Sequence, residues 1–189
     1  LEELSGVDPD VREGTSRQDE WIGLQEAFVE KHLGDLSNNY DFWSVRLGIQ
    51  GFASDFRGFM FADNNLGVRL FGTADSNRIN WNLAYFHQLE KDTNSGLNDI
   101  TRRMRADDVF LFNVYRQDSL AGVFGTDALG FGFTSQATVL YNRNREGSRP
   151  DFYNENGFLE RPAIFGSGRR HDYDVTYLGY NGDGHVGKW

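Results

Sequence analysis

The sequence predicts an all-β fold, an antiparallel up-and-down transmembrane β-barrel, and three observations support this prediction. Aromatic residues make up 15% of the 189 residues and there are 22 glycines, although the mean hydropathy is only −0.58. In several segments apolar and polar residues alternate at every second position, and short connections between these segments alternate with long ones. A wall with one lipid-facing side and one water-facing side has this composition and this period. The many aromatic residues exclude a disordered chain.

Several classes of protein are excluded by the composition. The formal net charge of −9 does not suit a nucleic-acid-binding surface, which needs a basic stripe. The chain has no cysteine, which rules out disulfides, thiolate metal sites and a cysteine nucleophile. No stretch reaches the ~20 apolar residues of a transmembrane helix. A Gly-x-Ser-x-Gly nucleophile motif is also missing, and we expect neither an enzyme nor a cofactor.

The alternation predicts the strands in order. The clearest strand carries four large apolar residues on one face: Ile79, Trp81, Leu83 and Tyr85. About eight strands are visible, and they are expected at 20–33, 43–50, 66–70, 78–85, 108–117, 129–141, 171–180 and from His185 onward. Segment 20–33 also fits a helical spacing, so a helix is an alternative there. Residues 1–19 are polar and are expected to form a loop or mobile end, while 20–189 form a barrel segment, truncated at its C-terminus, of a larger barrel.

The lengths of the connections favour an outer-membrane barrel. In order they are expected at 34–41, 53–65, 73–77, 90–107, 118–128, 142–170 and 181–184. The even-numbered connections are the longer ones, and antiparallel strands place alternate connections at opposite ends. Short turns at one rim and long loops at the other are typical of outer-membrane barrels, where the long loops face outward.

The polar faces of the strands predict a pore lining, since they offer Asn, Gln, Arg and Asp rather than the Lys and Glu of a soluble sheet. The predicted lining residues are Arg46, Arg69, Arg78, Asn80, Asn82, Gln136, Asp172 and Asp174. If neighbouring strands pair in sequence order, the three arginines lie side by side. They then form either a basic ladder that favours anionic solutes or interstrand contacts with acidic partners.

Two further features concern the lumen. Asp55 and Arg57 lie between aromatic residues, and they predict either a constriction loop folded toward the lumen or a structural salt bridge. The segment 108–117 is apolar on both faces. We expect its residues Phe110, Phe112 and Val114 to point inward, where a plug or a protein partner covers them.

Metal binding has little support. The stretch 92–99 offers oxygen ligands at alternating positions, with Asp92, Asn94 and Asp99 as calcium candidates, but it lacks the closing Glu of a calcium loop. A solvated turn is the simpler interpretation. The four histidines share no metal-ligand spacing. Asp172 and Asp174 are a possible pair of carboxylates for glycoside chemistry, which no other residue supports.

Four stretches resemble a group of uncharacterised proteobacterial outer-membrane β-barrel proteins, broadly similar to porins and alginate-export barrels. They are YDFWSVRLGIQ at 40–50, SDFRGF at 54–59, LGVRLFG at 66–72 and YLGYNGDGH at 177–185. The resemblance covers about residues 20–189. It implies a barrel in the outer membrane with further strands after the Gly-Asp-Gly-His turn, and it implies no particular solute or catalytic residue.

The sequence therefore predicts a porin-like channel in the cell outer membrane, in contact with its lipid, for small polar or anionic solutes. Two alternatives stay open. One is a structural barrel that holds a protein partner or plug. The other is a soluble periplasmic β-domain that binds sugar or lipid.

Overall fold

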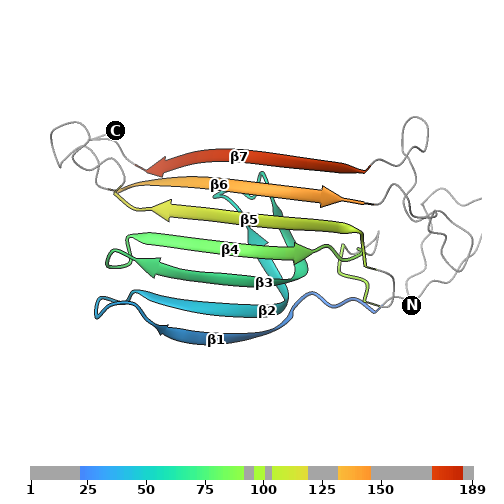
Figure 1. Ribbon diagram of the computed structural model, residues 1–189, viewed down its shortest axis with the longest axis horizontal. Coiled ribbons are helices and arrows are strands. Elements are labelled where there is room, and N and C mark those ends of the chain that lie inside the picture. Colours follow the sequence, from blue (N-terminus) through green and yellow to red (C-terminus); the bar gives the residue numbers. More distant parts are fainter. Residues whose placement is uncertain (1–21, 92–95, 101–103, 119–131, 146–171, 185–189) are drawn as a thin grey trace, which may run out of the picture.

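The computed structural model describes residues 22–91, 96–100, 104–118, 132–145 and 172–184. These residues form one seven-stranded antiparallel sheet in which each strand pairs with the next in sequence order, an up-and-down topology (Figure 1). The strands are β1 (Ala27–Asp35), β2 (Phe42–Ala53), β3 (Ala62–Ala74), β4 (Ile79–His87), β5 (Asp107–Arg116), β6 (Phe133–Asn144) and β7 (Tyr173–Gly184). The predicted all-β, antiparallel up-and-down arrangement is confirmed. The sheet is open, because β1 and β7 do not pair with each other.

The strand boundaries differ from the predicted ones chiefly in β1, β2 and β3. Residues 22–26 precede β1 and make one isolated bridge, between Gly23 and Asp99, so this segment is neither a helix nor a continuous strand. β2 and β3 are longer than predicted, and their far ends form a hairpin that folds over one face of the sheet, behind β4, β5 and β6 in Figure 1. The eighth strand expected from His185 lies outside the described residues.

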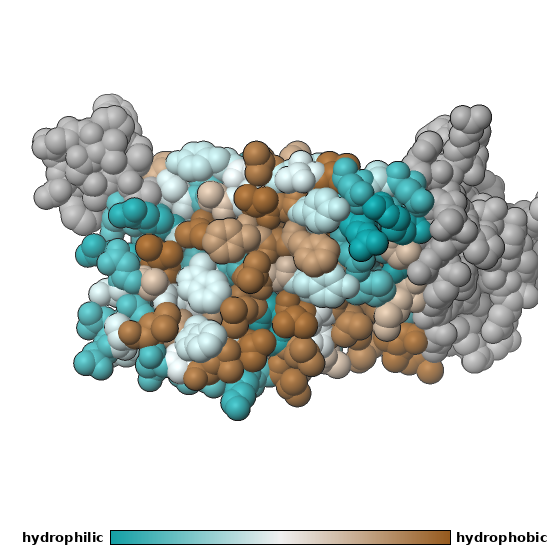
Figure 2. Space-filling model, in the orientation of Figure 1, coloured by the Kyte–Doolittle hydropathy of each residue, from teal (hydrophilic) through white to brown (hydrophobic). Residues whose placement is uncertain are grey.

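One face of the sheet, called here the apolar face, carries apolar side chains in rows that cross the strands. The register of β2 to β7 aligns the row Val45, Leu70, Leu83, Phe112, Val139 and Leu178. The neighbouring row on one side begins with Trp43 and ends with Tyr180, and the row on the other side begins with Leu47 and ends with Thr176. None of these three rows contains a charged residue between β2 and β7. Figure 2 shows their apolar side chains across the middle of the molecule.

These apolar side chains are exposed rather than packed against another layer. Leu178 is 78% exposed, Leu83 is 52% exposed and Phe112 is 45% exposed. Soluble monomers rarely leave so wide a continuous apolar surface open to water. The next row toward the long connections is polar from β4 onward, with His87, Asp108, Arg143 and Asp174.

The opposite face, called here the covered face, is packed under the end of the β2–β3 hairpin. A small core on this face consists of Phe52, Ala84, Phe86, Val109, Leu111 and Leu140, with Met60 and Phe61 packed against it. Phe86 is fully buried, and its ring stacks on Phe61 with centroids 5.5 Å apart. Around this core the covered face is polar, and Gln50, Asn65, Asn113 and Gln136 are among its buried side chains.

The orientation of the side chains of β5 corrects one expectation from the sequence. Val109 and Leu111 point to the covered face and are buried there, whereas Phe110 and Phe112 are exposed on the apolar face, which Val114 shares. A strand that is apolar on both sides does need a cover for its inner side. That cover is the chain's own β2–β3 hairpin, whose Met60 and Phe61 pack against the core.

The connections lie at two rims, as antiparallel pairing requires. Residues 36–41, 75–78 and 117–132 connect strands at one rim, and residues 54–61, 88–106 and 145–172 connect them at the other. Asp41 links the connection 36–41 to the connection 75–78. Its carboxylate accepts hydrogen bonds from Ser37 Oγ (2.7 Å) and from the backbone N–H of Asn77 (2.8 Å). These bonds hold the pKa of the Asp41 carboxyl below its usual value. They also stabilise the turn 75–77, whose three residues all have positive φ.

Within the described part of the chain, no helix is long and apolar enough to cross a membrane.

Candidate functional site

The candidate site is the covered face together with the connection 54–61, which crosses it. The carbonyl oxygen of Ser54 accepts hydrogen bonds from three side chains of the sheet: Asn113 Nδ2 (2.9 Å), Thr138 Oγ1 (3.1 Å) and Gln136 Nε2. Asn113 and Gln136 are almost completely buried. A buried amide costs free energy unless its hydrogen bonds are made, so these contacts fix the connection onto β5 and β6.

The connection 54–61 crosses the covered face as far as β7, the last strand of the sheet. Phe56 packs edge-on against Tyr115 of β5, with ring centroids 5.4 Å apart. Gly179 on β7 faces the sulfur of Met60, and a Cβ at this glycine would overlap that sulfur. A cleft of about 680 Å³ remains between the connection and β7, and polar side chains such as Asp55, Asn181 and Asp183 are among those that line it.

Asp55 organises the connection from within. Its carboxylate accepts hydrogen bonds from the backbone N–H groups of Arg57 (3.0 Å), Phe59 (2.9 Å) and Met60 (2.9 Å) and from Ser54 Oγ (3.1 Å). Burial alone would raise the pKa of Asp55, but the hydrogen bonds from Met60, Phe59 and Arg57 outweigh it, and the pKa lies below its usual value. Asp55 therefore binds the backbone of Arg57, and the structure gives no salt bridge between the two side chains.

We expect Asp55→Asn to loosen this connection. The amide would turn an N–H₂ group toward either the Met60 or the Phe59 N–H, and hydrogen bonds to a charged acceptor are the stronger kind. Amide hydrogen exchange at Phe59 and Met60 should become about tenfold faster or more at pH 7, while exchange in β4 stays unchanged.

The same carboxylate gives the wild-type protein a pH dependence. Its folded-state pKa is lowered relative to an unfolded value of about 3.9, so its stabilising effect is present above about pH 4 and disappears as the pH falls through the folded-state value. The Asp55→Asn variant should lack this acid-induced loosening. Equal exchange in wild type and variant at pH 7 would show that Asp55 does not hold the connection.

The predicted lining residues divide into two groups. Five of them share the covered face: Arg46, Arg69, Asn80, Asn82 and Gln136. The structure places the other three elsewhere. Arg78 ends the turn between β3 and β4, Asp172 precedes β7, and Asp174 faces the apolar side, opposite Arg143 and 2.6 Å from Arg145 Nη2.

Two of the three arginines expected to form a ladder are direct neighbours. Arg46 on β2 lies opposite Arg69 on β3. Arg46 Nε donates a hydrogen bond to Glu30 Oε2 on β1 (2.7 Å), so one of the two guanidinium groups has an acidic partner. The structure therefore contains both features that the sequence left open, an arginine pair and an interstrand ion pair.

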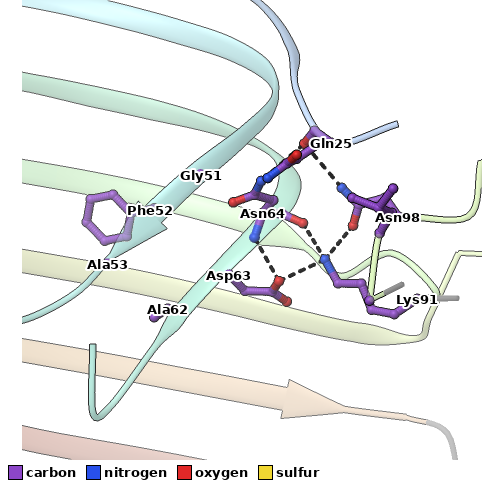
Figure 3. Close-up of a pocket in the computed structure, with 11 residues that line it drawn as sticks. Gln25, Gly51, Phe52, Ala53, Ala62, Asp63, Asn64, Lys91 and Asn98 are labelled. Atoms are coloured by element: carbon purple, nitrogen blue, oxygen red, sulfur yellow. Dashed lines mark hydrogen bonds and ion pairs between the residues drawn. The ribbon is translucent and has the colours of Figure 1, made fainter. Parts of the chain in front are cut away.

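A second polar cluster lies where the β2–β3 hairpin meets the connection 88–106, beside a pocket of about 510 Å³ (Figure 3). The ammonium group of Lys91 contacts three oxygens: Asp63 Oδ1 (2.8 Å), the carbonyl of Asn64 (2.6 Å) and Asn98 Oδ1. Asn98 Nδ2 donates in turn to the Leu24 carbonyl (3.0 Å). Lys91 thus connects three chain segments, and each of its three N–H donors has an oxygen partner.

The described residues give no support to the predicted calcium site. Asp92 and Asn94 lie outside the described residues, and Asp99 is buried. Among the described residues no group of three or more His, Asp or Glu side chains is placed to hold a metal ion.

Four residues of these contacts were not among the predicted site residues: Asn113, Thr138, Glu30 and Lys91. Asn113 does occupy a polar position in an otherwise apolar stretch of β5, which is a usable signal for a buried contact, whereas Thr138 is one of many polar residues in β6. Their acceptor, the Ser54 carbonyl, carries no signal, because every residue has a carbonyl.

Comparisons of the chain with models of known protein families, with curated proteins and with solved structures found no significant match.

Proposed function

We propose that the chain forms part of the wall of an outer-membrane β-barrel, a porin-like channel for small polar or anionic solutes. The observation that supports this proposal is the inverted distribution of side chains. More polar than apolar side chains are buried among the described residues, while large apolar ones lie exposed in continuous rows. A soluble sheet has the opposite arrangement, and a barrel wall between lipid and a wet lumen has this one.

In this proposal the apolar face contacts lipid and the covered face lines the lumen. The rows without charged residues would lie in the hydrocarbon layer. The polar row His87, Asp108, Arg143 and Asp174 would then meet the lipid headgroups at the rim of the longer connections, which face the outside of the cell in such barrels. The free edges of β1 and β7 would pair with further strands, because unpaired backbone groups are not tolerated in lipid.

The connection 54–61 would narrow the lumen. It crosses the covered face from β2 toward β7 and is held by the Ser54 carbonyl and by the carboxylate of Asp55. Arg57 and Phe59 are exposed on this connection, so they are positioned to meet a passing solute. Because this connection already covers Val109 and Leu111, the inward side of β5 needs no separate protein plug.

The proposal is tested by recording ion currents from the full-length protein in planar lipid bilayers. We expect stable channels in the wild type and larger or noisier openings in Asp55→Asn, since the loosened connection then blocks less of the lumen. Ser135→Ala, on the apolar face of β6, serves as the control and should match the wild type. Folded, inserted protein that never conducts would contradict the channel and would favour a structural barrel.

A further inference from the structure

Arginine and phenylalanine side chains alternate across β1, β2 and β3 on the covered face. The guanidinium carbon of Arg46 lies 4.2 Å from the ring centre of Phe28 and 5.7 Å from that of Phe71. The guanidinium carbon of Arg69 lies 4.4 Å from the ring centre of Phe71 and 5.4 Å from that of Phe52. Aromatic faces attract these planar cations and restrict their orientation. The two guanidinium groups are therefore held side by side before any solute arrives.

This group of arginine and phenylalanine side chains carries more positive than negative charge. Glu30 is hydrogen-bonded to Arg46. For Arg69, the described residues provide neither a hydrogen-bond acceptor nor a carboxylate within ion-pair distance, and its Nε is buried without a partner. Asp55 and Asp63 do not supply this carboxylate, because backbone N–H groups engage the first and Lys91 engages the second.

We infer that Arg69, assisted by Arg46, binds a small oxyanion, such as a carboxylate or a phosphate. A partly buried guanidinium without an acceptor is costly, and an oxyanion can accept two parallel hydrogen bonds from its planar fork. A neutral solute would leave the excess charge in place, and chloride cannot make the paired contact. The inference rests on the proposed channel, because solutes reach the covered face if that face lines the lumen.

The site is tested on the full-length protein in planar bilayers bathed in potassium chloride. Inorganic phosphate is added as the probe, and the concentration that halves the chloride current is measured. In Arg69→Gln this concentration should rise about tenfold, the expected effect of losing one charge-assisted contact. Arg143→Gln removes an exposed arginine from the apolar face and should leave the phosphate block unchanged.

The variant Arg69→Lys shows whether a weaker phosphate block results from misfolding alone. It keeps the positive charge but not the planar fork, so it should retain preference for chloride over potassium while the phosphate block weakens. A phosphate block that is equal in wild type, Arg69→Gln and Arg69→Lys would overturn the site and leave the channel intact.

If the wild type does not conduct, the proposed channel fails and the site is tested separately. Calorimetric titration of the detergent-solubilised full-length protein with phosphate then decides the matter. Binding that is present in the wild type and lost in Arg69→Gln would support the site. No heat of binding in the wild type would overturn it.

Discussion

For the proposed membrane wall, Leu83→Arg should lower the free energy of unfolding of the protein in lipid vesicles by about 2–4 kcal/mol. Leu83 is exposed at the centre of the uncharged rows of the apolar face, with Leu70 and Phe112 as its neighbours across the sheet. An arginine at the middle of a barrel wall costs about 2–4 kcal/mol when it faces lipid. The measurement is the free energy of unfolding in urea, with the protein inserted in lipid vesicles.

Asn80→Arg provides the matched control for this prediction. Asn80 lies on the same strand, but it points to the covered face. An arginine there would face the proposed lumen and should change the free energy of unfolding by less than about 1 kcal/mol. If the two variants lose equal stability, the apolar face is not in contact with lipid.

Phe86→Ala should destabilise the protein by about 3–5 kcal/mol, the usual cost of removing a buried phenylalanine. Phe86 has no exposed surface, and its ring packs between Phe52 and Phe61 at centroid distances of 5.7 and 5.5 Å. Its loss would leave a cavity between the sheet and the β2–β3 hairpin, so the connection 54–61 should also become more mobile. Urea unfolding in vesicles and hydrogen exchange at Met60 measure these two effects.

Phe112→Ala is the corresponding change on the apolar face, where the ring is 45% exposed. In the proposed membrane wall, lipid chains would fill the space left by this ring, and we expect a clearly smaller loss of stability than for Phe86→Ala. A larger loss at Phe112 would mean that the core of the protein lies on the apolar face, under a protein layer.

The sequence predicted most of the sheet because the alternation of side chains is a local property. Trp43, Val45 and Leu47 share one face, as do Ile79, Trp81 and Leu83, and the structure confirms both sets. The alternation of connection lengths also predicted which connections share a rim.

Where both faces of a strand carry similar residues, the alternation does not show which of the two faces points to the core. This explains why the inward side of β5 was predicted wrongly: Val109 and Phe110 are both apolar, and only the register with β4 and β6 decides between them. In β7 the pairing of Asp174 with Arg143, together with the contact to Arg145, places the acidic side chain on the apolar face.

The candidate site was predictable only in part. Arg46 and Arg69 could be placed side by side from sequential strand pairing, and Asp55 could be assigned to a connection that folds inward. The contacts that hold this connection join residues about sixty to eighty positions apart, such as Ser54 with Asn113 and Thr138. No local pattern encodes such contacts, because they depend on where the hairpin of β2 and β3 bends.

The most direct test of the proposed membrane wall is the cellular fractionation of the full-length protein, combined with gel electrophoresis of heated and unheated samples. The proposal predicts that the protein is found in the outer-membrane fraction and that the unheated band migrates differently from the heated one, as folded barrels do. A protein that stays in solution without detergent, with one band under both conditions, would contradict the proposal. The exposed rows around Leu83 and Phe112 would then be the contact surface for a second protein layer.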